Sequence, residues 1–304
     1  MNASALRILV TGALGQVGWE LQRTLAPLGS ITAVDLAELD IGDPDAVRAF
    51  VRDLRPDILV NPAAYTAVDK AETQADIAMA VNGVAPGVMA EEMAKLGGLM
   101  IHYSTDYVFD GTKQGAWIES DRPKPLGVYG RTKLAGEQAV QSVGGAHLIL
   151  RTSWVYGRRG GNFMLTMIRL AKERDELRVV ADQHGAPTWC RTLAVGTAAL
   201  VRKTWADGPA RERARAELSG VYHFTNGGST TWHRFAQAIV AEAPELRERR
   251  HVNVMPIGTA DYPLPAPRPA NSVLDNSKLL SAFGLVQLPW EQALNDCLVD
   301  PSVV

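Results

Sequence analysis

The chain has 304 residues, of which 46% are hydrophobic, and its 31 basic and 33 acidic side chains nearly cancel. This length allows one large domain or two, and the balanced charge excludes an overall basic field that would hold nucleic acid or an anionic membrane surface. The two cysteines have neither metal-ligand spacing nor a disulfide framework, which favours a reducing compartment. Since there is also no signal-peptide pattern and no apolar run long enough to span a bilayer, we expect a cytoplasmic protein that binds neither nucleic acid nor membrane.

The first predicted element is a buried strand over residues 7–11, which runs into a glycine-rich turn and then a helix. Gly12, Gly15 and Gly18 stand on that turn at an even spacing of three. Gly12 would permit the tight bend, Gly15 would let a pyrophosphate approach the helix N-terminus, and Gly18 would let the helix pack closely on the sheet. Ordinary strand-to-helix turns carry the same pattern, so both interpretations stay open at this point.

The next predicted strand, over residues 31–34, strengthens the nucleotide-binding interpretation. It ends at Asp35, at the distance beyond the glycines where a carboxylate reaches the adenine ribose of a dinucleotide. This carboxylate would repel a 2′-phosphate, and Leu36 and Ala37 bring no positive charge. Charge alone therefore favours NADH over NADPH.

Strands and helices continue to alternate along the first half of the chain. Further strands are predicted over residues 57–61, 99–103 and 147–150, with helices from about 69 to 96 and from about 129. This order, with its short connections, predicts an α/β fold with a Rossmann-like, doubly wound parallel sheet. Ligands of such a sheet bind at the carboxyl ends of the strands.

The regular alternation ends after about residue 155. A glycine-rich loop at 157–161, further helices, a charged stretch near 207–217 and a proline-rich segment at 261–272 follow. We therefore expect a dinucleotide-binding domain over residues 1–155, to which some later segments return, and a smaller, mainly substrate-binding C-terminal region over residues 156–304.

Tyr129 and Lys133 stand four residues apart on a predicted helix, so their side chains share one face. A phenol, with an ordinary pKa of about 10, can donate its proton to a carbonyl oxygen, and we expect the nearby ammonium to lower that pKa toward the working range. A tyrosine and a lysine also meet by chance on exposed helices. Ser104 and Thr105 end the fourth predicted strand, where a hydroxyl would assist the same carbonyl, and this favours the catalytic interpretation.

Together these motifs resemble the extended short-chain dehydrogenases/reductases, which act largely on nucleotide sugars. The resemblance rests on the three glycines, "NPAA" at 61–64, Ser104-Thr105 and the Tyr129–Lys133 pair. It narrows to members that reduce a 4-keto-6-deoxy sugar nucleotide. The motifs that carry this narrower resemblance span essentially the whole chain: "GQVGWEL" at 15–21, "TAVDKAE" at 66–72, "IHYSTDYVFDG" at 101–111, "YGRTKLAGE" at 129–137, "RTSWVYG" at 151–157, "DQHGAPT" at 182–188 and "RPANS" at 268–272.

The resemblance implies roles for individual residues. Tyr129 would be the general acid, Lys133 would tune it and hold the nicotinamide ribose, and Thr105 would orient the sugar carbonyl. The other residues placed around NADPH or NADH are Gly12, Gly15, Gln16, Val17, Gly18, Asp35, Asp40, Ile41, Ala64, Tyr65 and Thr66. The residues placed around a dTDP-sugar substrate are Thr105, Asp106 and Trp154.

Some positions have a structural alternative or depart from the resemblance. Trp154 is either a ligand-facing indole or a core aromatic, and Arg268 either meets the diphosphate or forms a structural salt bridge. Some relatives bind Mg²⁺ through glutamates near a subunit contact, where a homodimer would form. Glu20 matches one such glutamate, but residues 189–191 include no carboxylate where another is expected. The six histidines show no ligand spacing either, so we predict no metal site.

Three functions remain consistent with the sequence. The first is a reductase that transfers hydride from NADPH or NADH to C4 of a 4-keto-6-deoxy sugar nucleotide. The second is a sugar-nucleotide epimerase, which keeps its dinucleotide bound through an oxidation and a re-reduction. The third is a non-catalytic regulatory subunit that binds the dinucleotide without turning it over. Such a subunit has no need of Tyr129 and Lys133, so their joint presence argues against it.

Overall fold

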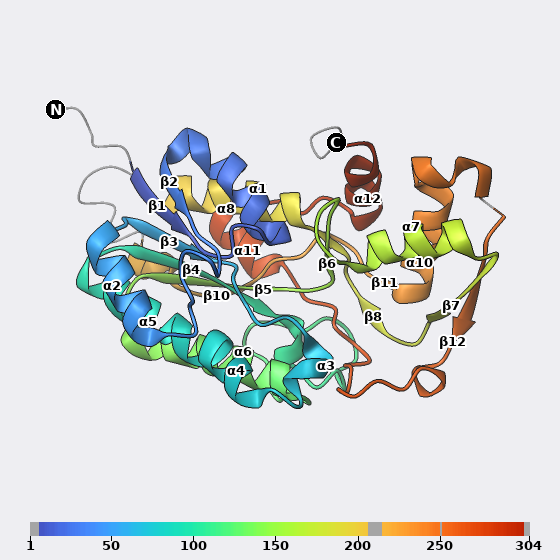
Figure 1. Ribbon diagram of the computed structural model, residues 1–304, viewed down its shortest axis with the longest axis horizontal. Coiled ribbons are helices and arrows are strands. Elements are labelled where there is room, and N and C mark those ends of the chain that lie inside the picture. Colours follow the sequence, from blue (N-terminus) through green and yellow to red (C-terminus); the bar gives the residue numbers. More distant parts are fainter. Residues whose placement is uncertain (1–5, 206–214, 250, 301–304) are drawn as a thin grey trace.

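A parallel sheet lies at the centre of the molecule in the computed structural model, which describes residues 6–205, 215–249 and 251–300 (Figure 1). Its strands follow the order β10-β5-β4-β3-β1-β2, and every neighbouring pair is parallel. They are β1 (Leu6–Val10), β2 (Gly29–Ala33), β3 (Ile58–Asn61), β4 (Leu99–Thr105), β5 (His147–Thr152) and β10 (Gly220–His223). The predicted Rossmann-like α/β fold is confirmed.

Helices cover both faces of the sheet, as Figure 1 shows. One face packs on α1 (Gln16–Leu25), α8 (Cys190–Thr204) and α11 (Ser277–Phe283), and the other on α2 (Pro44–Leu54), α5 (Ala85–Lys95) and α6 (Val128–Val143). Val10 packs into the first of these cores and Leu9 into the second, because successive residues of a strand point to opposite faces. Across the three described stretches, every helix is too short or too polar to span a bilayer.

The prediction of one continuous helix from about residue 69 to 96 is wrong, because residues 72–74 are not helical. The run is divided into α3 (Val68–Ala71), α4 (Ala75–Met79), a π-helical turn over Ala80–Val84 and α5. The π turn contains Asn82, whose side-chain amide accepts a hydrogen bond from the backbone N–H of Tyr65 at 2.8 Å and donates one to its carbonyl at 3.0 Å. The π turn, through which α4 continues into α5, thus carries the side chain that holds the loop after β3.

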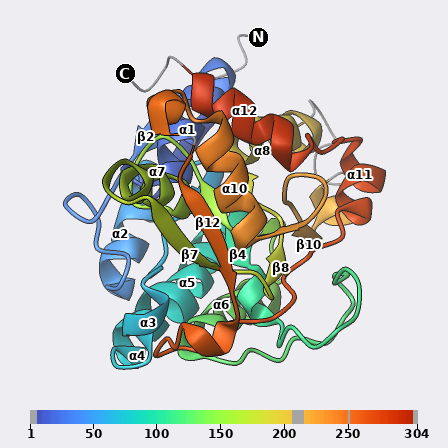
Figure 2. The same cartoon turned by 90° about the vertical axis from the view of Figure 1, so that its right-hand side faces the viewer.

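A second group of elements packs beside the sheet, on the right in Figure 1 and facing the viewer in Figure 2. Its own core includes Tyr156, Phe235 and Leu294. The longer elements are α7 (Phe163–Glu173), β7 (Glu176–Val180), α10 (Trp232–Glu242), β12 (Asn253–Ile257) and α12 (Trp290–Val299); the short strands are β6 (Val155–Tyr156), β8 (His184–Gly185), β9 (Thr188–Trp189) and β11 (Thr230–Thr231). We call this group the second lobe.

The predicted division at residues 155/156 stays a prediction. Three elements of the later half, α8, β10 and α11, pack with the central sheet. This agrees with the expectation that some later segments return to the dinucleotide-binding domain. Most of the charged stretch near residues 207–217 lies outside the described residues.

Candidate active site

The turn between β1 and α1 lies at the point where the strand order reverses, because β1 pairs with β2 on one side and β3 on the other. Gly12 has a φ of +59°, a left-handed conformation that glycine adopts without strain. A Cβ on Gly18 would lie 2.0 Å from the Gly12 carbonyl oxygen, so only glycine permits this approach. Gly15 is the N-cap of α1 and no side chain caps the helix. The turn therefore has the geometry that a pyrophosphate requires.

The carboxylate of Asp35 holds the glycine turn in place. Its oxygens accept hydrogen bonds from the backbone amides of Leu14 at 2.8 Å and Leu36 at 2.9 Å. Asp40 is exposed on the following loop, whereas Ile41 is buried in the core beneath α2. The predicted contacts of these residues with the adenosine stay predictions.

The loop after β3 lies against the glycine turn. A Cβ on Gly12 would come within 3.0 Å of the Ala63 backbone, so the two loops touch. Ala64, Tyr65 and Thr66 continue this loop, and the Tyr65 side chain packs against the same small apolar cluster as that of Tyr129. The predicted cofactor floor and the predicted acid are thus close neighbours.

Gln16 and Val17 connect the turn to the second lobe. The Asn162 side chain, which caps α7, donates a hydrogen bond to Gln16 Oε1 at 2.9 Å. Val17 packs against the cores of both the sheet and the second lobe. The predicted pyrophosphate-binding residues therefore lie where the two parts of the chain meet.

The start of α6 is positioned by two contacts. Glu72 accepts a hydrogen bond from the backbone amide of Val128 at 2.8 Å. A Cβ on Gly130 would lie 2.2 Å from the carbonyl oxygen of Tyr107, so glycine lets the helix approach the segment after β4. The rings of Tyr107 and Tyr129 consequently meet edge to face, with centroids 5.5 Å apart.

The pKa of Tyr129 is raised to about 12, chiefly by burial and also by the Asp106 carboxylate, while a hydrogen bond with Thr105 opposes the rise. The ammonium of Lys133 is engaged elsewhere, because its Nζ donates to the Tyr103 carbonyl at 2.7 Å. The expectation that Lys133 lowers the pKa of Tyr129 is therefore wrong for this arrangement. The phenol is instead a fully protonated donor at neutral pH.

Lys133 is 2% exposed, and burial lowers its pKa to about 8, although the negative charge of Glu137 acts to raise it. Arg151 binds both oxygens of Glu137, at 2.9 and 2.6 Å. The Ser104 hydroxyl also donates to Glu137. Of the two hydroxyls at the end of β4, that of Ser104 therefore belongs to this buried ion pair, and Thr105 is the one predicted to assist the substrate carbonyl.

Asp106 lies beside the tyrosine and is 2% exposed. Burial raises its pKa to about 6, while hydrogen bonds with Ser272 and Thr105 oppose the rise. The Thr105 hydroxyl donates to Asp106 Oδ1 at 3.0 Å. The structure thus brings Thr105, Asp106 and Tyr129 together, and their contacts with substrate stay predictions.

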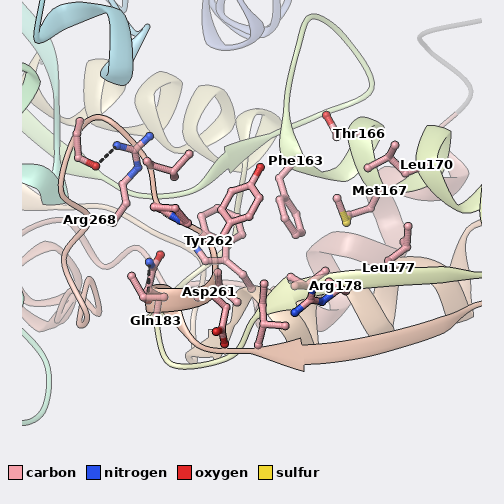
Figure 3. A pocket seen from close by; sticks show the side chains of 18 of the residues that line it. Phe163, Thr166, Met167, Leu170, Leu177, Arg178, Gln183, Asp261, Tyr262 and Arg268 are labelled. Atoms are coloured by element: carbon pink, nitrogen blue, oxygen red, sulfur yellow. Dashed lines mark hydrogen bonds between the residues drawn. The ribbon is translucent and has the colours of Figure 1, made fainter.

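A cavity of about 790 Å³ opens beside this group (Figure 3). Apolar side chains of α7 and β7 line it, among them Phe163 and Leu177, together with the polar Arg178 and Gln183 and the segment from Ile257 to Arg268. Tyr107 is the one lining residue that comes from the segment after β4, while Tyr129, Lys133 and Thr105 themselves do not line the cavity. The Tyr107 ring, which contacts Tyr129, is therefore the link between the cavity and the group formed by Thr105, Asp106 and Tyr129.

Trp154 packs against a residue that lines the cavity. Its indole stacks on that of Trp232, a lining residue, with centroids 3.6 Å apart and planes at 11°. Trp154 has a φ of +48°, which is unusual for a bulky residue and typical of functional sites. A Cβ on Gly185 would lie 2.4 Å from this indole, so the glycine of "GAPT" provides its space. Trp154 is half-buried, and its contact with ligand stays a prediction.

Arg268 forms the structural salt bridge that was one of its two interpretations. It donates to Asp69 at 2.9 Å and to the carbonyl of Ala266 at 2.8 Å. Its side chain also lines the cavity, as Figure 3 shows. The alternative contact with a diphosphate is untested.

Glu20 is paired with a cation from the chain itself. Arg191 donates to its two oxygens at 2.9 and 3.2 Å and also pairs with Asp300 at 2.9 Å. Within residues 6–205, 215–249 and 251–300, no cluster of three or more His, Cys, Asp or Glu side chains could hold a metal ion. These contacts engage Glu20, the residue that matched a metal ligand in the resemblance.

Several side chains around the site were not predicted. Tyr107, Gln183 and Trp232 line the cavity, and Asn82 holds the loop after β3. Tyr107 and Gln183 stand inside motifs that the resemblance used, so a signal for them existed. No sequence signal pointed to Trp232 or Asn82, because each reaches the site from a helical segment distant in sequence.

Comparisons with known proteins agree over the whole chain. A family model described as the RmlD substrate binding domain matches residues 6–302. A dTDP-4-dehydrorhamnose reductase of Burkholderia thailandensis is 50% identical over 299 residues, which cover 97% of this chain and 99% of the relative. A dTDP-4-dehydrorhamnose reductase of Escherichia coli K12 is 44% identical over 291 residues, which cover 94% of this chain and 95% of the relative.

Solved structures give the same result. The dTDP-4-dehydrorhamnose reductase of Bacillus anthracis in complex with NADP is similar with a TM-score of 0.87 and 37% identity, over 97% of this chain and 99% of that one. The UDP-glucose 4-epimerase of Thermus thermophilus in complex with NAD has a TM-score of 0.76 at 20% identity, over 96% of this chain and 98% of that one. The second likeness shows the fold alone.

Proposed function

The chain belongs to the RmlD substrate-binding-domain family, and from that premise we propose that it is an NAD(P)H-dependent dTDP-4-dehydrorhamnose reductase. It reduces the C4 keto group of dTDP-4-dehydro-β-L-rhamnose to dTDP-β-L-rhamnose, the last step of dTDP-L-rhamnose synthesis. The observation that carries this proposal is that Thr105 and the protonated Tyr129 meet between the glycine turn and the cavity, in a chain 50% identical to a protein of that name.

The residues of the glycine turn fit a nicotinamide dinucleotide. The left-handed Gly12, the uncapped N-terminus of α1 and the close approach at Gly18 together accept a pyrophosphate. Asp35 stands at the carboxyl end of β2, where it would meet the adenine ribose. The dinucleotide supplies the hydride when bound, and the chain supplies its position and a proton.

The proton comes from Tyr129. Hydride addition at C4 leaves negative charge on the former carbonyl oxygen, and the phenol donates its hydrogen there as the charge develops. Its raised pKa keeps the phenol protonated before the reaction. Thr105, which hydrogen-bonds the same phenol, orients it and the sugar oxygen. The rest of the dTDP-sugar extends past the Tyr107 ring into the cavity.

The two cysteines, Cys190 and Cys297, are free and buried, which fits a reducing compartment. We accordingly place the enzyme in the cytoplasm. A homodimer remains an expectation of the resemblance.

Tyr129→Phe tests the proposal, because it removes one oxygen and keeps the ring. General-acid catalysis contributes roughly 10²–10⁴ in rate, so kcat should fall by about that factor while NADPH affinity changes little. The assay mixes protein, dTDP-4-dehydro-β-L-rhamnose and NADPH and follows the nicotinamide absorbance. Tyr222→Phe is the matched control, because the hydroxyl of this buried tyrosine donates to the Leu218 carbonyl. The kcat of this variant should stay within about twofold of the wild type.

The assay also separates the alternatives. An epimerase would convert its sugar nucleotide without added NADPH and would purify with its dinucleotide bound. A regulatory subunit would bind NADPH and oxidise none. If Tyr129→Phe kept more than about a third of the wild-type turnover, a loss under about 1 kcal/mol in barrier, Tyr129 would not be the acid.

A further inference from the structure

A buried chain of polar side chains runs through the sheet to Lys133. Thr11 Oγ1 lies 2.6 Å from Asn61 Oδ1, Asn61 Nδ2 lies 3.1 Å from His102 Nδ1, and His102 Nε2 lies 3.4 Å from Lys133 Nζ. Each of the four side chains is at most 2% exposed. The chain begins at the residue before the glycine turn and ends on the catalytic helix.

The sheet register brings these side chains together. β3 lies between β1 and β4, and Asn61 stands directly opposite His102 in the parallel pair. His102 does not line the cavity, and Asn61 and Lys133 contact its two ring nitrogens. Its imidazole therefore acts on the reaction through Lys133, which the resemblance places on the nicotinamide ribose.

We propose that His102 is a positioning residue for the reduction, whose Nε2 accepts a hydrogen bond from the Lys133 ammonium. This bond and the one to the Tyr103 carbonyl, at 2.7 Å, hold Nζ in one place. The inference rests on the proposed reductase function.

The role requires one tautomer of the imidazole. A neutral ring has one donor and one acceptor nitrogen, so an Nε2 that accepts from Lys133 leaves the hydrogen on Nδ1, facing Asn61. This tautomer requires the Asn61 amide to be turned so that its oxygen faces Nδ1 and its nitrogen faces Thr11, the reverse of the orientation in which Nδ2 lies 3.1 Å from Nδ1. The Thr11 hydroxyl can donate or accept, so it is compatible with the turned amide.

The surroundings keep the ring neutral. Burial first, and then the charge of Lys133, hold the pKa of His102 well below its ordinary value, while a hydrogen bond with the Asn61 backbone acts in the opposite direction. A neutral ring can accept from an ammonium, whereas a protonated one would repel it.

The charge of Lys133 is sensitive to its neighbours. From β4 it faces the Tyr103 carbonyl and His102, and from its own helix it faces Glu137, which Arg151 of β5 binds; Tyr129 lies one turn earlier. Burial lowers the pKa of Lys133 to about 8 and Glu137 opposes this. Losing the His102 acceptor should lower it further, because that hydrogen bond favours the charged form.

The test compares the pH dependence of kcat in His102→Leu, His102→Gln and wild type. In His102→Leu the alkaline midpoint should fall by about one unit, so that above it kcat is about tenfold lower, while KM for the sugar nucleotide stays within about twofold. His102→Gln can return an amide oxygen to Nζ and should restore most of the midpoint. The control is His223→Leu, because His223 is equally buried in β10 but bonds the Trp117 carbonyl; its midpoint should not move.

Two outcomes overturn the inference. One is a His102→Leu midpoint that rises or stays within about 0.3 unit of the wild type; the other is a shift that His223→Leu reproduces. NMR titration of the Lys133 Cε resonance in folded, NADPH-binding protein measures the same displacement without turnover. A wild type that does not reduce the sugar nucleotide therefore refutes the proposed function, while the NMR titration still decides the role of His102.

Discussion

The glycine turn and the cavity are stabilised in different ways. The turn depends on backbone sterics and on hydrogen bonds to the backbone. Gly12 has a left-handed conformation, and Gly18 lies so close to the Gly12 carbonyl that it has no room for a Cβ. The Asp35 carboxylate accepts hydrogen bonds from two backbone N–H groups. The cavity depends on side chains, with Trp154 stacked on Trp232. A turn without room for a methyl group should fail abruptly when changed, whereas a stacked wall should weaken gradually. Cofactor and substrate affinities should therefore respond to separate mutations.

Gly18→Ala should give the largest effect. The new methyl carbon would lie 2.0 Å from the Gly12 carbonyl oxygen, so the start of α1 must move away from the turn. A displacement of this kind can reduce activity by about 10²-fold, and we expect the Kd of NADPH, measured by fluorescence titration, to rise by about that factor.

Gly87→Ala is the matched control for this change. Gly87 also lies within a helix, and its added carbon would meet only the side chain and backbone of Ala139 on α6. We expect it to change the unfolding midpoint and leave the Kd of NADPH within about twofold. Equal cofactor losses in the two variants would mean that the turn has no special role.

Trp154→Ala should give an intermediate effect, on the other ligand. It removes the ring that supports Trp232 at 3.6 Å, and losing such an aromatic contact costs about 1–2 kcal/mol. The KM for the sugar nucleotide should rise about 5- to 30-fold, with the Kd of NADPH nearly unchanged. Trp154→Phe keeps a stacking ring and should recover most of the loss. An unaltered KM in Trp154→Ala would confine Trp154 to a role in the core.

Cofactor preference should give the smallest effect. Asp35 disfavours a 2′-phosphate, but each of its oxygens already accepts a hydrogen bond from a backbone N–H, and the pyrophosphate that we propose binds at the turn is common to both dinucleotides. We expect kcat/KM for NADPH and NADH to differ by less than tenfold, or under about 1.4 kcal/mol. A ratio above a hundred in either direction would reveal a contact to the 2′ position that charge at Asp35 does not explain.

The sequence correctly predicted those backbone features of the candidate site whose geometry is local. The left-handed turn at Gly12 and the helix that carries Tyr129 and Lys133 depend on residues within a few positions of one another. The sequence does not show which of the two hydroxyls at the end of β4 is available to a ligand. The Ser104 hydroxyl joins Glu137, whose other partner Arg151 comes from another strand, and no spacing in the sequence indicates that choice.

The sequence by itself determined the α/β fold, the glycine turn and the helix on which the predicted acid stands, because hydrophobic periodicity and backbone sterics act over short stretches of chain. Only the tertiary structure decided the protonation of these groups. The pKa of Tyr129 rises because burial and Asp106 outweigh the Thr105 hydrogen bond, and Lys133 turns to the Tyr103 carbonyl. Desolvation depends on what the rest of the chain packs around a group, and that packing joins segments far apart in sequence.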